Sequence, residues 1–594
     1  MGVTEMTVRG AAAGTAGAAP PPHPDESVGP LERGFAVLRA LANAPGGRLR
    51  ASELTRGTGL ARSTVDRVAT TLVELGALRA EGDGRDLVLA PAAARLGGAY
   101  LRGSALPETL GPLARDLAAR LDESVSLAVA DRDAVRFIVQ IKRRRALSVA
   151  FRAGDALPAE RCAPGALFAA DWDASDFEAW HARLADDPAC DDFAALPRSG
   201  RATEPRSPDP ARVEAGFRAR IDRAARDGWA EDDQLIEQGL IAVAVPVYDR
   251  AGAQVCALSV VSHTSRQTMR SLAEAVLPAM RACAARMTEA LAAHTAHTAP
   301  AAPPPAEPEP DVEPGAATAT APLDPTAAAK EQHGPGYLQS LARGISVLSA
   351  LGGGGPAGMT LSEAAAATGL PRATARRALL TSARQGYVAT DGHRFRVLPR
   401  VLELGYARLS QLSLGELAQP HLAEVVAAVH ESASMAVLDG ADIRYVARAA
   451  AGRIMSVDIM VGTRFPAYAT SMGRVLLADL PRPERVRRLE QTELIALTPH
   501  TVTDRAALAR VLDAAADEGC ALVDQELEEG LRSIAVPVRD PSGRAVAAVN
   551  VSTHAARTSA AEARAFVLPI LRAAASRIST DLALVSDAAA SVAG

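Results

Sequence analysis

Residues 58–78 read TGLARSTVDRVATTLVELGAL, and residues 368–388 read TGLPRATARRALLTSARQGYV. The two stretches lie 310 positions apart, align without a gap and share identical residues, which are Thr58, Gly59, Leu60, Arg62, Thr64, Arg67, Thr71 and Gly76 in the first copy. Each stretch reads as a turn followed by a helix that begins with basic and hydroxyl side chains. That layout is typical of the second helix of a helix-turn-helix, whose first residues meet base edges in the major groove of DNA. The sequence therefore predicts two DNA-reading heads on one chain.

Each stretch lies inside a longer pattern typical of a winged helix. An amphipathic helix is predicted before each stretch, because apolar residues recur at helical spacing from Leu31 and again from Leu341. Thr360 and Glu363 have the spacing of a capping box, which marks the start of a further helix. After each stretch, Gly-containing turns divide LRAEGDGRDLVLAP and VATDGHRFRVLP into two short strands. Three helices and a hairpin make a winged helix-turn-helix domain.

The remainder of each half is predicted to be a mixed domain. A linking helix is expected at residues 92–101 and at residues 400–412. Beyond it, strand-like runs such as Leu240–Val247 alternate with helical segments. The alignment of the two halves then shifts by seventeen positions, which indicates an insertion in the first half, expected at Leu196–Pro210.

These patterns divide the chain of 594 residues into six segments, and the length fits about four domains. A composition rich in Ala, Pro and Glu marks one segment as a flexible linker. The predicted segments are a disordered tail at 1–29, a winged helix-turn-helix domain at 30–102, an α/β domain at 103–294, the linker at 295–336, a second winged helix-turn-helix domain at 337–412 and a second α/β domain at 413–586. The predicted fold class is α+β, with head and α/β domain repeated in tandem.

Composition limits the classes of function. The formal net charge is −5, so DNA binding must depend on local patches of positive charge. The five cysteines form no CxxC pair, and neither a signal peptide nor an apolar run of membrane-spanning length is present. We therefore expect a cytoplasmic protein that is not in a membrane. Zinc-ligand spacing and phosphate-binding loops are absent from the sequence, so neither a metal nor a cofactor is predicted.

Basic and hydroxyl side chains at the start of each recognition helix are the candidate DNA contacts. Arginine can bind guanine bidentately, and hydroxyls can hold phosphate. Asp66 occupies the position of Arg376, so the two heads are expected to read different half-sites. A solvated helix face is the alternative, but a duplicated pattern ahead of a wing favours DNA binding. The candidates are Arg62, Ser63, Thr64, Arg67, Arg372, Thr374, Arg376, Arg377 and, in the second wing, Arg394.

The order of winged helix, linking helix and α/β domain resembles the isocitrate lyase regulator (IclR) family of bacterial transcription factors. The second half resembles in particular the branch that controls aromatic-acid catabolism through the beta-ketoadipate pathway, and the first half is a more distant match. The stretches that carry this likeness are RGISVL, TGLPRATARRAL, LELGYARLS, HESASMAVLDG, RIMSVDIMVGTRFPAYATSMGRVLLA, VDQELEEGLRSIAVPVRD and VNVSTHAARTS. The resemblance implies that each α/β domain is a GAF-like effector-binding domain.

The resemblance also implies a pocket for a small organic acid in the second half. A helix that starts near Ser471 would direct free N–H groups at a carboxylate, and Phe465, Tyr468 and Tyr445 could contact an aromatic ring. Ordinary strand residues with satisfied hydrogen bonds are the alternative for several of these positions. The implied effector-binding residues are Ser471, Met472, Asp524, Glu526, Ser533, Asn550 and Ser552.

The first half lacks most of this pattern. The matching positions hold Ala163, Pro164, Asp233, Leu235, Ala242, Ser259 and Val261. We therefore expect its pocket to bind a less polar ligand or none, and the domain to serve mainly as a scaffold for dimerisation. A catalytic role for Cys162 or for His263 and His554 is not favoured, because no partner lies at an interpretable spacing.

The sequence thus predicts a non-enzymatic transcriptional regulator that senses a small aromatic or keto acid and controls catabolic genes. The expected partners are double-stranded operator DNA, the acid, and either further copies of the chain or the other half of the same chain, in an intramolecular pseudo-dimer. The alternative is a ligand-binding sensor or scaffold that has lost DNA binding. The effector, the operator and the sign of regulation stay open.

Overall fold

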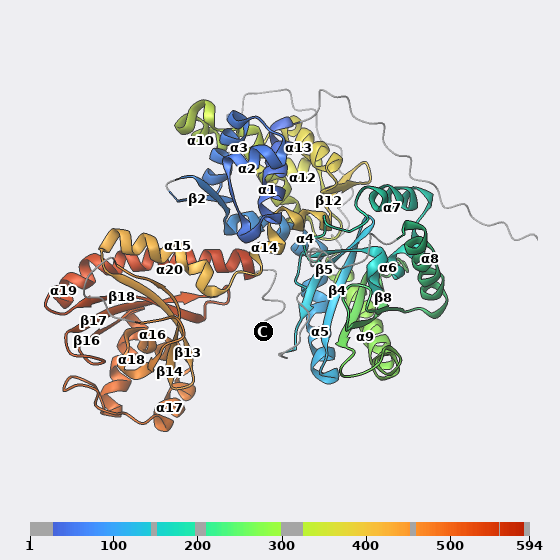
Figure 1. The fold of residues 1–594 in the computed structure, drawn as a ribbon. Coiled ribbons are helices and arrows are strands. Elements are labelled where there is room, and N and C mark those ends of the chain that lie inside the picture. Colours follow the sequence, from blue (N-terminus) through green and yellow to red (C-terminus); the bar gives the residue numbers. More distant parts are fainter. Residues whose placement is uncertain are drawn as a thin grey trace, which may run out of the picture.

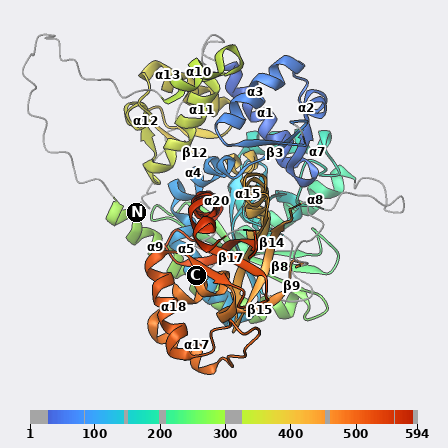
Figure 2. The same ribbon diagram turned by 90° about the vertical axis from the view of Figure 1, so that its left-hand side faces the viewer.

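The computed structural model describes residues 28–82, 84–143, 151–196, 209–298, 325–451, 459–557 and 559–586. Two small helical heads lie side by side, with one larger α/β domain below them on each side (Figure 1). A view turned by 90° shows both heads on the same side of the molecule (Figure 2). Residues 1–27 of the predicted tail lie outside the described residues, and helix α1 already begins at Gly29.

Both heads are winged helices, as the sequence predicts. Each contains helices that pack around a small core and a three-stranded sheet, of order β1-β3-β2 in the first head and β10-β12-β11 in the second. The first head comprises α1 (Gly29–Asn43), β1 (Arg48–Arg50), α2 (Ala51–Thr58), α3 (Arg62–Glu74), β2 (Leu78–Glu81) and β3 (Asp86–Leu89). The second comprises α11 (Gln339–Ala350), β10 (Met359–Thr360), α12 (Leu361–Thr368), α13 (Arg372–Arg384), β11 (Val388–Thr390) and β12 (Arg394–Val397).

The turn before each recognition helix follows from the repeated Thr-Gly pair. Gly59 and Gly369 end α2 and α12 with φ values of 69° and 65°, the left-handed conformation that glycine adopts without strain. The predicted capping box of α12 is present, since the Thr360 hydroxyl accepts from the Glu363 N–H and the Glu363 carboxylate accepts from the Thr360 N–H. These local signals place α3 and α13 at matching positions.

Each α/β domain, called a sensor domain from here on, is a six-stranded antiparallel sheet with helices on both faces. The strand order is β6-β5-β4-β9-β8-β7 in the first and β15-β14-β13-β18-β17-β16 in the second. The strands are β4 (Ser124–Asp131), β5 (Ala134–Ile141), β6 (Ala156–Pro158), β7 (Ala230–Asp233), β8 (Leu240–Tyr248), β9 (Gln254–His263), β13 (Ser432–Asp439), β14 (Asp442–Ala449), β15 (Arg464–Pro466), β16 (Ala521–Asp524), β17 (Leu531–Arg539) and β18 (Ala545–His554).

Helices cover the two faces of each sheet in the same way. In the first sensor domain, α5 (Leu106–Leu121) and α9 (Met269–Thr298) lie on one face and α6 (Ala163–Phe168) with α8 (Pro210–Asp227) on the other. In the second, α15 (Leu414–Val429) and α20 (Leu568–Ser586) lie on one face and α16 (Ser471–Ala478) with α18 (Arg505–Glu518) on the other. The predicted α+β class in tandem is therefore confirmed.

The first sensor domain contains an aromatic cluster between α7 (Ala174–Asp186) and α8. Helix α7 carries Trp180, whose ring centroid is 5.2 Å from that of Phe217 on α8. The second sensor domain has the shorter α17 (Arg482–Gln491) in this region. Residues 197–208, most of the stretch in which the insertion is predicted, lie outside the described residues.

The two linking segments differ, although a helix is predicted for both. In the first half α4 (Ala94–Ser104) is a continuous helix. In the second half a 3₁₀ helix, η8 (Pro399–Leu404), ends at Gly405 with φ of 120°, and a short α14 (Tyr406–Leu409) follows. The prediction of one helix over 400–412 is thus wrong, because Gly405 leaves the helical region of backbone conformation.

The predicted linker at 295–336 is shorter than expected. Helix α9 continues to Thr298, and α10 (Pro325–His333) and a 3₁₀ turn at Gly334–Gly336 precede the second head. This second segment is bound to the first head, because His333 Nε2 lies 2.9 Å from the Glu74 carboxylate. The composition of 325–336 resembles the rest of the linker, but its contacts with the head stabilise it. Residues 299–324 lie outside the described residues.

The two heads pack directly against each other. Leu31 of α1 lies against Gly344 of α11, and Leu341 of α11 lies against Gly34 of α1. The Val28 N–H donates to Thr381 Oγ1 at 3.0 Å, and the matching Leu338 N–H donates to Thr71 Oγ1 at 2.8 Å. These reciprocal contacts relate the heads as two halves of a pair. The small glycines are needed, because a side chain there would collide with the facing leucine.

Candidate functional site

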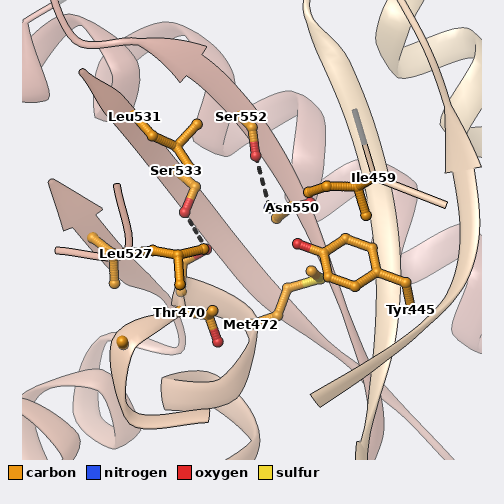
Figure 3. A pocket seen from close by; sticks show the side chains of 12 residues that line it. Tyr445, Ile459, Thr470, Met472, Leu527, Leu531, Ser533, Asn550 and Ser552 are labelled. Carbon is orange, nitrogen blue, oxygen red and sulfur yellow. Dashed lines mark hydrogen bonds between the residues drawn. The ribbon is translucent and has the colours of Figure 1, made fainter. Parts of the chain in front are cut away.

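The second sensor domain contains a narrow pocket between its sheet and the start of α16 (Figure 3). The space has a volume of about 10 Å³, enough for about one water molecule. The residues that line it come from β14, β16, β17, β18, α16 and the loops beside them. They are Tyr445, Ile459, Ala469, Thr470, Ser471, Met472, Val523, Leu527, Leu531, Ser533, Asn550 and Ser552. The described conformation is closed, so a ligand larger than water requires side chains to move.

The strand register explains why polar side chains meet here. Ser533 of β17 pairs with Ser552 of β18, and Val523 of β16 pairs with Ser533. Asn550 lies two residues before Ser552 on the same strand, so both side chains point to the same face of the sheet. The sheet therefore presents a row of small polar groups toward α16.

The start of α16 faces this row. Ser471 and Met472 occupy the first two helical positions, where backbone N–H groups have no partner inside the helix. Thr470 caps the helix by accepting from the Gly473 N–H at 3.1 Å. Ser471 Oγ lies 2.8 Å from Ser533 Oγ, which joins the helix to the sheet. The positive end of the helix dipole and two hydroxyls thus meet at one end of the pocket, an arrangement that favours a bound anion.

One hydrogen-bonding atom in the pocket lacks a partner. Asn550 Nδ2 donates to Ser552 Oγ at 3.1 Å, whereas Asn550 Oδ1 is buried without a hydrogen bond among the described residues. Figure 3 shows the Tyr445 ring reaching into the same space, next to Asn550 and Met472. Burial raises the pKa of the Tyr445 hydroxyl to about 12, so this group is a neutral phenol near pH 7. A ligand hydroxyl that donates to Asn550 Oδ1 would satisfy the orphaned acceptor.

Two of the candidate effector-binding residues lie outside the pocket lining. Glu526 forms a buried ion pair with Arg474, whose Nη1 lies 2.7 Å from Glu526 Oε1, and it also accepts from the Val502 N–H. Asp524 accepts from Arg532 Nη2 at 2.8 Å. Because neighbouring strand residues point to opposite faces, Asp524 points away from the pocket that Val523 lines. The other five candidates, Ser471, Met472, Ser533, Asn550 and Ser552, are brought together.

Several lining residues were not singled out from the sequence. Ile459, Val523, Leu527 and Leu531 are apolar and read as ordinary core residues. Strand alternation was the available signal for Val523, since it lies two residues from Ala521 on the inward face of β16. Ile459 follows residues 452–458, which lie outside the described residues, and the sequence offered no pattern that would place it.

The matching region of the first sensor domain is apolar. Phe137 and Phe151 occupy the positions of Tyr445 and Ile459, and their rings stack at 5.7 Å. Ala163, Ala242 and Val261, in place of the three pocket serines, belong to one buried apolar cluster with both rings. The hydroxyls that face the second pocket are therefore replaced here by packed hydrocarbon.

A buried acid adds to this difference. Asp232, which stands in place of Val523, has no solvent exposure, and burial raises its pKa to about 7. Its Oδ1 accepts from the Leu235 N–H at 2.7 Å, and its Oδ2 has no partner among the described residues. A carboxylate at this position would repel an organic acid. Of the other matched positions, Asp233 and Leu235 lie in or next to the turn after β7, and Ser259, in place of Asn550, is buried on β9.

The second recognition helix exposes its candidate DNA contacts. Arg372, Arg376 and Arg377 are exposed near the start of α13, and Thr374 is partly buried. Arg394 of the wing is different, because its Nη1 donates to the Gly358 carbonyl oxygen at 2.7 Å and lies 3.6 Å from the Glu363 carboxylate. Arg394 therefore holds the wing strand against the start of α12.

The arginines of the first recognition helix bind other groups of the same chain. Arg62 Nε donates to Asp66 Oδ1 at 2.9 Å, one turn along α3. Arg67 Nε donates to the Pro335 carbonyl oxygen at 3.1 Å, in the segment that leads to the second head. Ser63 is exposed and Thr64 is partly buried at the start of the helix. The two heads thus present different basic surfaces, as the exchange of Arg376 for Asp66 predicts.

Models of two domain families match the chain, and each matches it twice. The IclR helix-turn-helix domain matches residues 30–82 and 340–392, and the bacterial transcriptional regulator IclR C-terminal domain matches residues 208–289 and 406–580. The Pca regulon regulatory protein of Pseudomonas putida is 44% identical over 241 residues, which are 40% of this chain and 82% of that protein. This chain belongs to the IclR family of bacterial transcriptional regulators.

Other IclR-type proteins match to a similar extent. The p-hydroxybenzoate hydroxylase transcriptional activator of Acinetobacter baylyi is 35% identical over 241 residues, 40% of this chain and 89% of that protein. A crystal structure of a transcriptional regulator from Rhodococcus sp. RHA1 is 52% identical, covers 42% of this chain and 99% of that chain, and gives a TM-score of 0.39. Each of these relatives corresponds in length to one half of the chain. The regulator is therefore a tandem of two IclR units.

The described residues form neither a metal site nor a membrane-spanning helix. Within the described ranges, no three His, Cys, Asp or Glu side chains come close enough together to hold a metal ion. Across those ranges, no helix combines the length and apolar character that crossing a bilayer requires. Cys162, the thiol considered as a nucleophile, is buried, and burial raises its pKa above the ordinary value.

Proposed function

We propose that this IclR-family regulator binds a hydroxylated aromatic carboxylic acid in the pocket of its second sensor domain. The observation that carries the proposal is Asn550 Oδ1, a buried acceptor without a described partner, in a pocket that also faces the start of α16. An orphaned buried acceptor costs free energy that a ligand hydroxyl would recover. A carboxylate at the other end would meet free N–H groups and the hydroxyls of Ser471 and Ser533.

The shape of the pocket fits the same class of ligand. Tyr445, Met472 and Ile459 supply an apolar and aromatic wall between the anion-binding end and Asn550. The names of two relatives point the same way, because one is a regulator of the Pca regulon and the other an activator of p-hydroxybenzoate hydroxylase. Ser471, Met472, Ser533, Asn550 and Ser552 are the proposed effector-binding residues. Asp524 and Glu526 act in ion pairs nearby.

We further infer that the two heads of one chain act as a pair on double-stranded operator DNA in the cytoplasm. The contact between α1 and α11 supports this, because it joins both heads without a second chain. Effector binding would change operator affinity only if it stabilises one placement of the heads more than another. The protein would act as a regulator and not as an enzyme. Assembly into homo-oligomers would then add further heads to a pair that each chain already contains.

A thermal-shift series tests the ligand. 3-Hydroxybenzoate, 4-hydroxybenzoate and benzoate are added to the full chain and to an Asn550→Leu variant. At least one hydroxybenzoate is expected to bind at least about tenfold more tightly than benzoate, the equivalent of one hydrogen bond. In the variant this preference disappears. Equal binding of all three acids by the native chain, or a preference that survives in the variant, would contradict the proposal.

A DNA-binding assay tests the heads. Upstream DNA of the regulator's own gene is titrated at several salt concentrations, with light scattering to count chains in each complex. The proposal predicts binding that weakens steeply as salt rises, with one chain sufficient for a specific complex. A folded protein that shows only non-specific binding would support the sensor or scaffold alternative.

A further inference from the structure

The first sensor domain lies against the linking segment of the second half of the chain. Arg136 Nη2 of β5 is 3.7 Å from Glu403 Oε2 of η8. Next to this pair, Ser410 Oγ donates to the Ala153 carbonyl oxygen at 3.3 Å, and Gly154 packs closely against Ala407. Arg136 is also bound to Asp131, with its Nε 2.7 Å from Asp131 Oδ2. A sensor domain from one half therefore docks on the linking segment of the other half.

Glu403 is the centre of this contact. Tyr387 of the second head donates its hydroxyl to Glu403 Oε1 at 2.8 Å, and Arg400 Nε donates to the same oxygen at 3.3 Å. Arg39 Nη1 of the first head lies 3.8 Å from it. One carboxylate thus contacts the first head, the second head and, through Arg136, the first sensor domain.

The reciprocal contact is missing among the described residues, although the second sensor domain repeats the aspartate–arginine pair. The second sensor domain repeats the Asp131–Arg136 pair as Asp439 and Arg444, whose side chains are 38% and 47% exposed, whereas those of Asp131 and Arg136 are each 7% exposed. Val461, which matches Ala153, is 63% exposed. The second sensor domain therefore keeps the aspartate–arginine pair of this surface in an exposed position, where Asp439 also binds Arg464.

One of the differences between the two sides reverses a charge. Alignment of PAAARLGGAYLR with PRVLELGYARLS places Arg95 at the position of Glu403. Arg95 is exposed on α4. Docking of the second sensor domain on α4 would bring Arg444 toward Arg95, two like charges at the position where the first side has an ion pair. Electrostatics therefore favours one docked arrangement and disfavours its mirror image.

We propose that Glu403 is a positioning residue that docks the first sensor domain on the second linking segment, and that Arg95 excludes the second sensor domain from the equivalent place. The chain then has a built-in asymmetry. Its first sensor domain joins the two heads through Glu403, whereas the equivalent surface of its second sensor domain stays exposed, and this domain contacts α4 through α20 instead. A movement of the second sensor domain can change the placement of the heads while the contact between Arg136 and Glu403 stays intact.

Paired cysteine substitutions in the full chain test this asymmetry. Ala153→Cys with Ser410→Cys reports the docked side, and Val461→Cys with Arg102→Cys reports the equivalent positions on the other side. The native cysteines are all buried, so the unsubstituted chain serves as the background. Under mild oxidation the first pair is expected to cross-link within the chain at least about tenfold faster than the second. Equal rates for the two pairs would overturn the proposal.

Charge substitutions then distinguish positioning from a general effect on folding. Glu403→Arg is expected to reduce cross-linking of the first pair at least about tenfold, and Glu403→Gln by less, since the amide still accepts from Tyr387. Arg95→Glu, added to the chain with Val461→Cys and Arg102→Cys and with native Glu403, should raise cross-linking of the second pair. A rate for the first pair that is unchanged in both Glu403 variants, or a second pair that Arg95→Glu leaves at background, would overturn the proposal even if Glu403→Arg fails to fold.

Discussion

The two sensor domains share one strand order, but they differ in the side chains that lie between the sheet and the helix α6 or α16. In the second domain, Ser471, Ser533 and Asn550 surround a narrow polar space. In the first, the stacked rings of Phe137 and Phe151 lie among buried alanines and Val261. The fold is maintained by the alternation of apolar residues and by the helices on the outer face, and both are common to the two domains. The pocket residues are therefore free to change without loss of the sheet.

The difference extends to the charges behind the pocket. The second domain buries the ion pair of Arg474 and Glu526, whereas the matching positions in the first domain are Ala166 and Leu235. A buried ion pair contributes little net stability compared with well-packed apolar residues. The pair joins the start of α16 to the turn after β16, whereas in the first domain the buried Glu160 before α6 pairs with Arg183 of α7. The comparison separates residues that build the fold from residues that build the site.

The largest expected effect comes from breaking that pair. Glu526→Leu leaves Arg474 charged and without its carboxylate, which is expected to destabilise the second sensor domain by about 3–5 kcal/mol. Adding Arg474→Ala copies the first domain and should recover much of the loss. Calorimetry of the full chain measures this, and tryptophan fluorescence is the internal control, because Trp172, Trp180 and Trp229 all lie in the first sensor domain. If the double variant is no more stable than Glu526→Leu alone, the loss of stability does not come from the unpaired charge of Arg474.

A transplant of the first domain's pocket residues should remove effector binding. Ser533→Ala with Ser552→Val copies Ala242 and Val261, and it deletes two hydroxyls from the proposed pocket. We expect at least about a hundredfold loss of affinity for the aromatic acid, since each buried hydrogen bond contributes roughly 1.5 kcal/mol. Val261→Ser in the first domain is the matched control, and it should leave affinity unchanged. Binding that persists in the transplant would place the ligand elsewhere.

The two heads are expected to respond differently to the loss of one arginine. Arg377→Ala removes an exposed side chain of α13 and should cost about 1–3 kcal/mol in specific DNA binding, without a change in thermal stability. Arg67→Ala should cost less, because Arg67 is already bonded to the Pro335 carbonyl oxygen. Competition binding with matched DNA fragments compares the variants. A larger loss of specific DNA binding for Arg67→Ala than for Arg377→Ala would show that the first head contributes more to DNA recognition.

A dependence on pH is expected in the first sensor domain. Burial raises the pKa of Asp232 from 3.8 to about 7, so the folded domain retains this proton after the unfolded chain has lost it. Stability should therefore fall as pH rises from about 4 to about 7, by at most about 1.4 kcal/mol for each pH unit, and this contribution stays constant above pH 7. Unfolding followed by tryptophan fluorescence measures the slope. Asp232→Asn should flatten it, and an unchanged slope would assign the dependence to other groups.

The sequence predicted the architecture because its signals are local. Gly59 and Gly369 mark the turns before the recognition helices, and Thr360 with Glu363 marks a helix start. The row of Ser533, Asn550 and Ser552 followed from the family resemblance, and the strand register explains why these side chains share one face. Long-range contacts were not predictable in this way. The bond from Arg67 to Pro335 joins residues 268 positions apart.

Two candidate residues show the same limit. The family resemblance implied that Asp524 and Glu526 contact the effector, whereas in the structure each is paired with an arginine outside the pocket lining. No local sequence pattern predicts which polar side chain forms an ion pair with a residue elsewhere in the fold. The break of the second linking helix at Gly405 was missed for a similar reason, because the matching Gly97 lies inside a continuous helix. Glycine permits either conformation, and packing selects between them.

The central proposal is that only the second sensor domain binds the effector. Isothermal titration of the full chain with a hydroxybenzoate, identified by the thermal-shift series, measures how many ligands each chain binds. The predicted result is one ligand per chain, and none in the variant that carries Ser533→Ala with Ser552→Val. Two ligands per native chain, or one that remains in this variant, would contradict the division between the two domains.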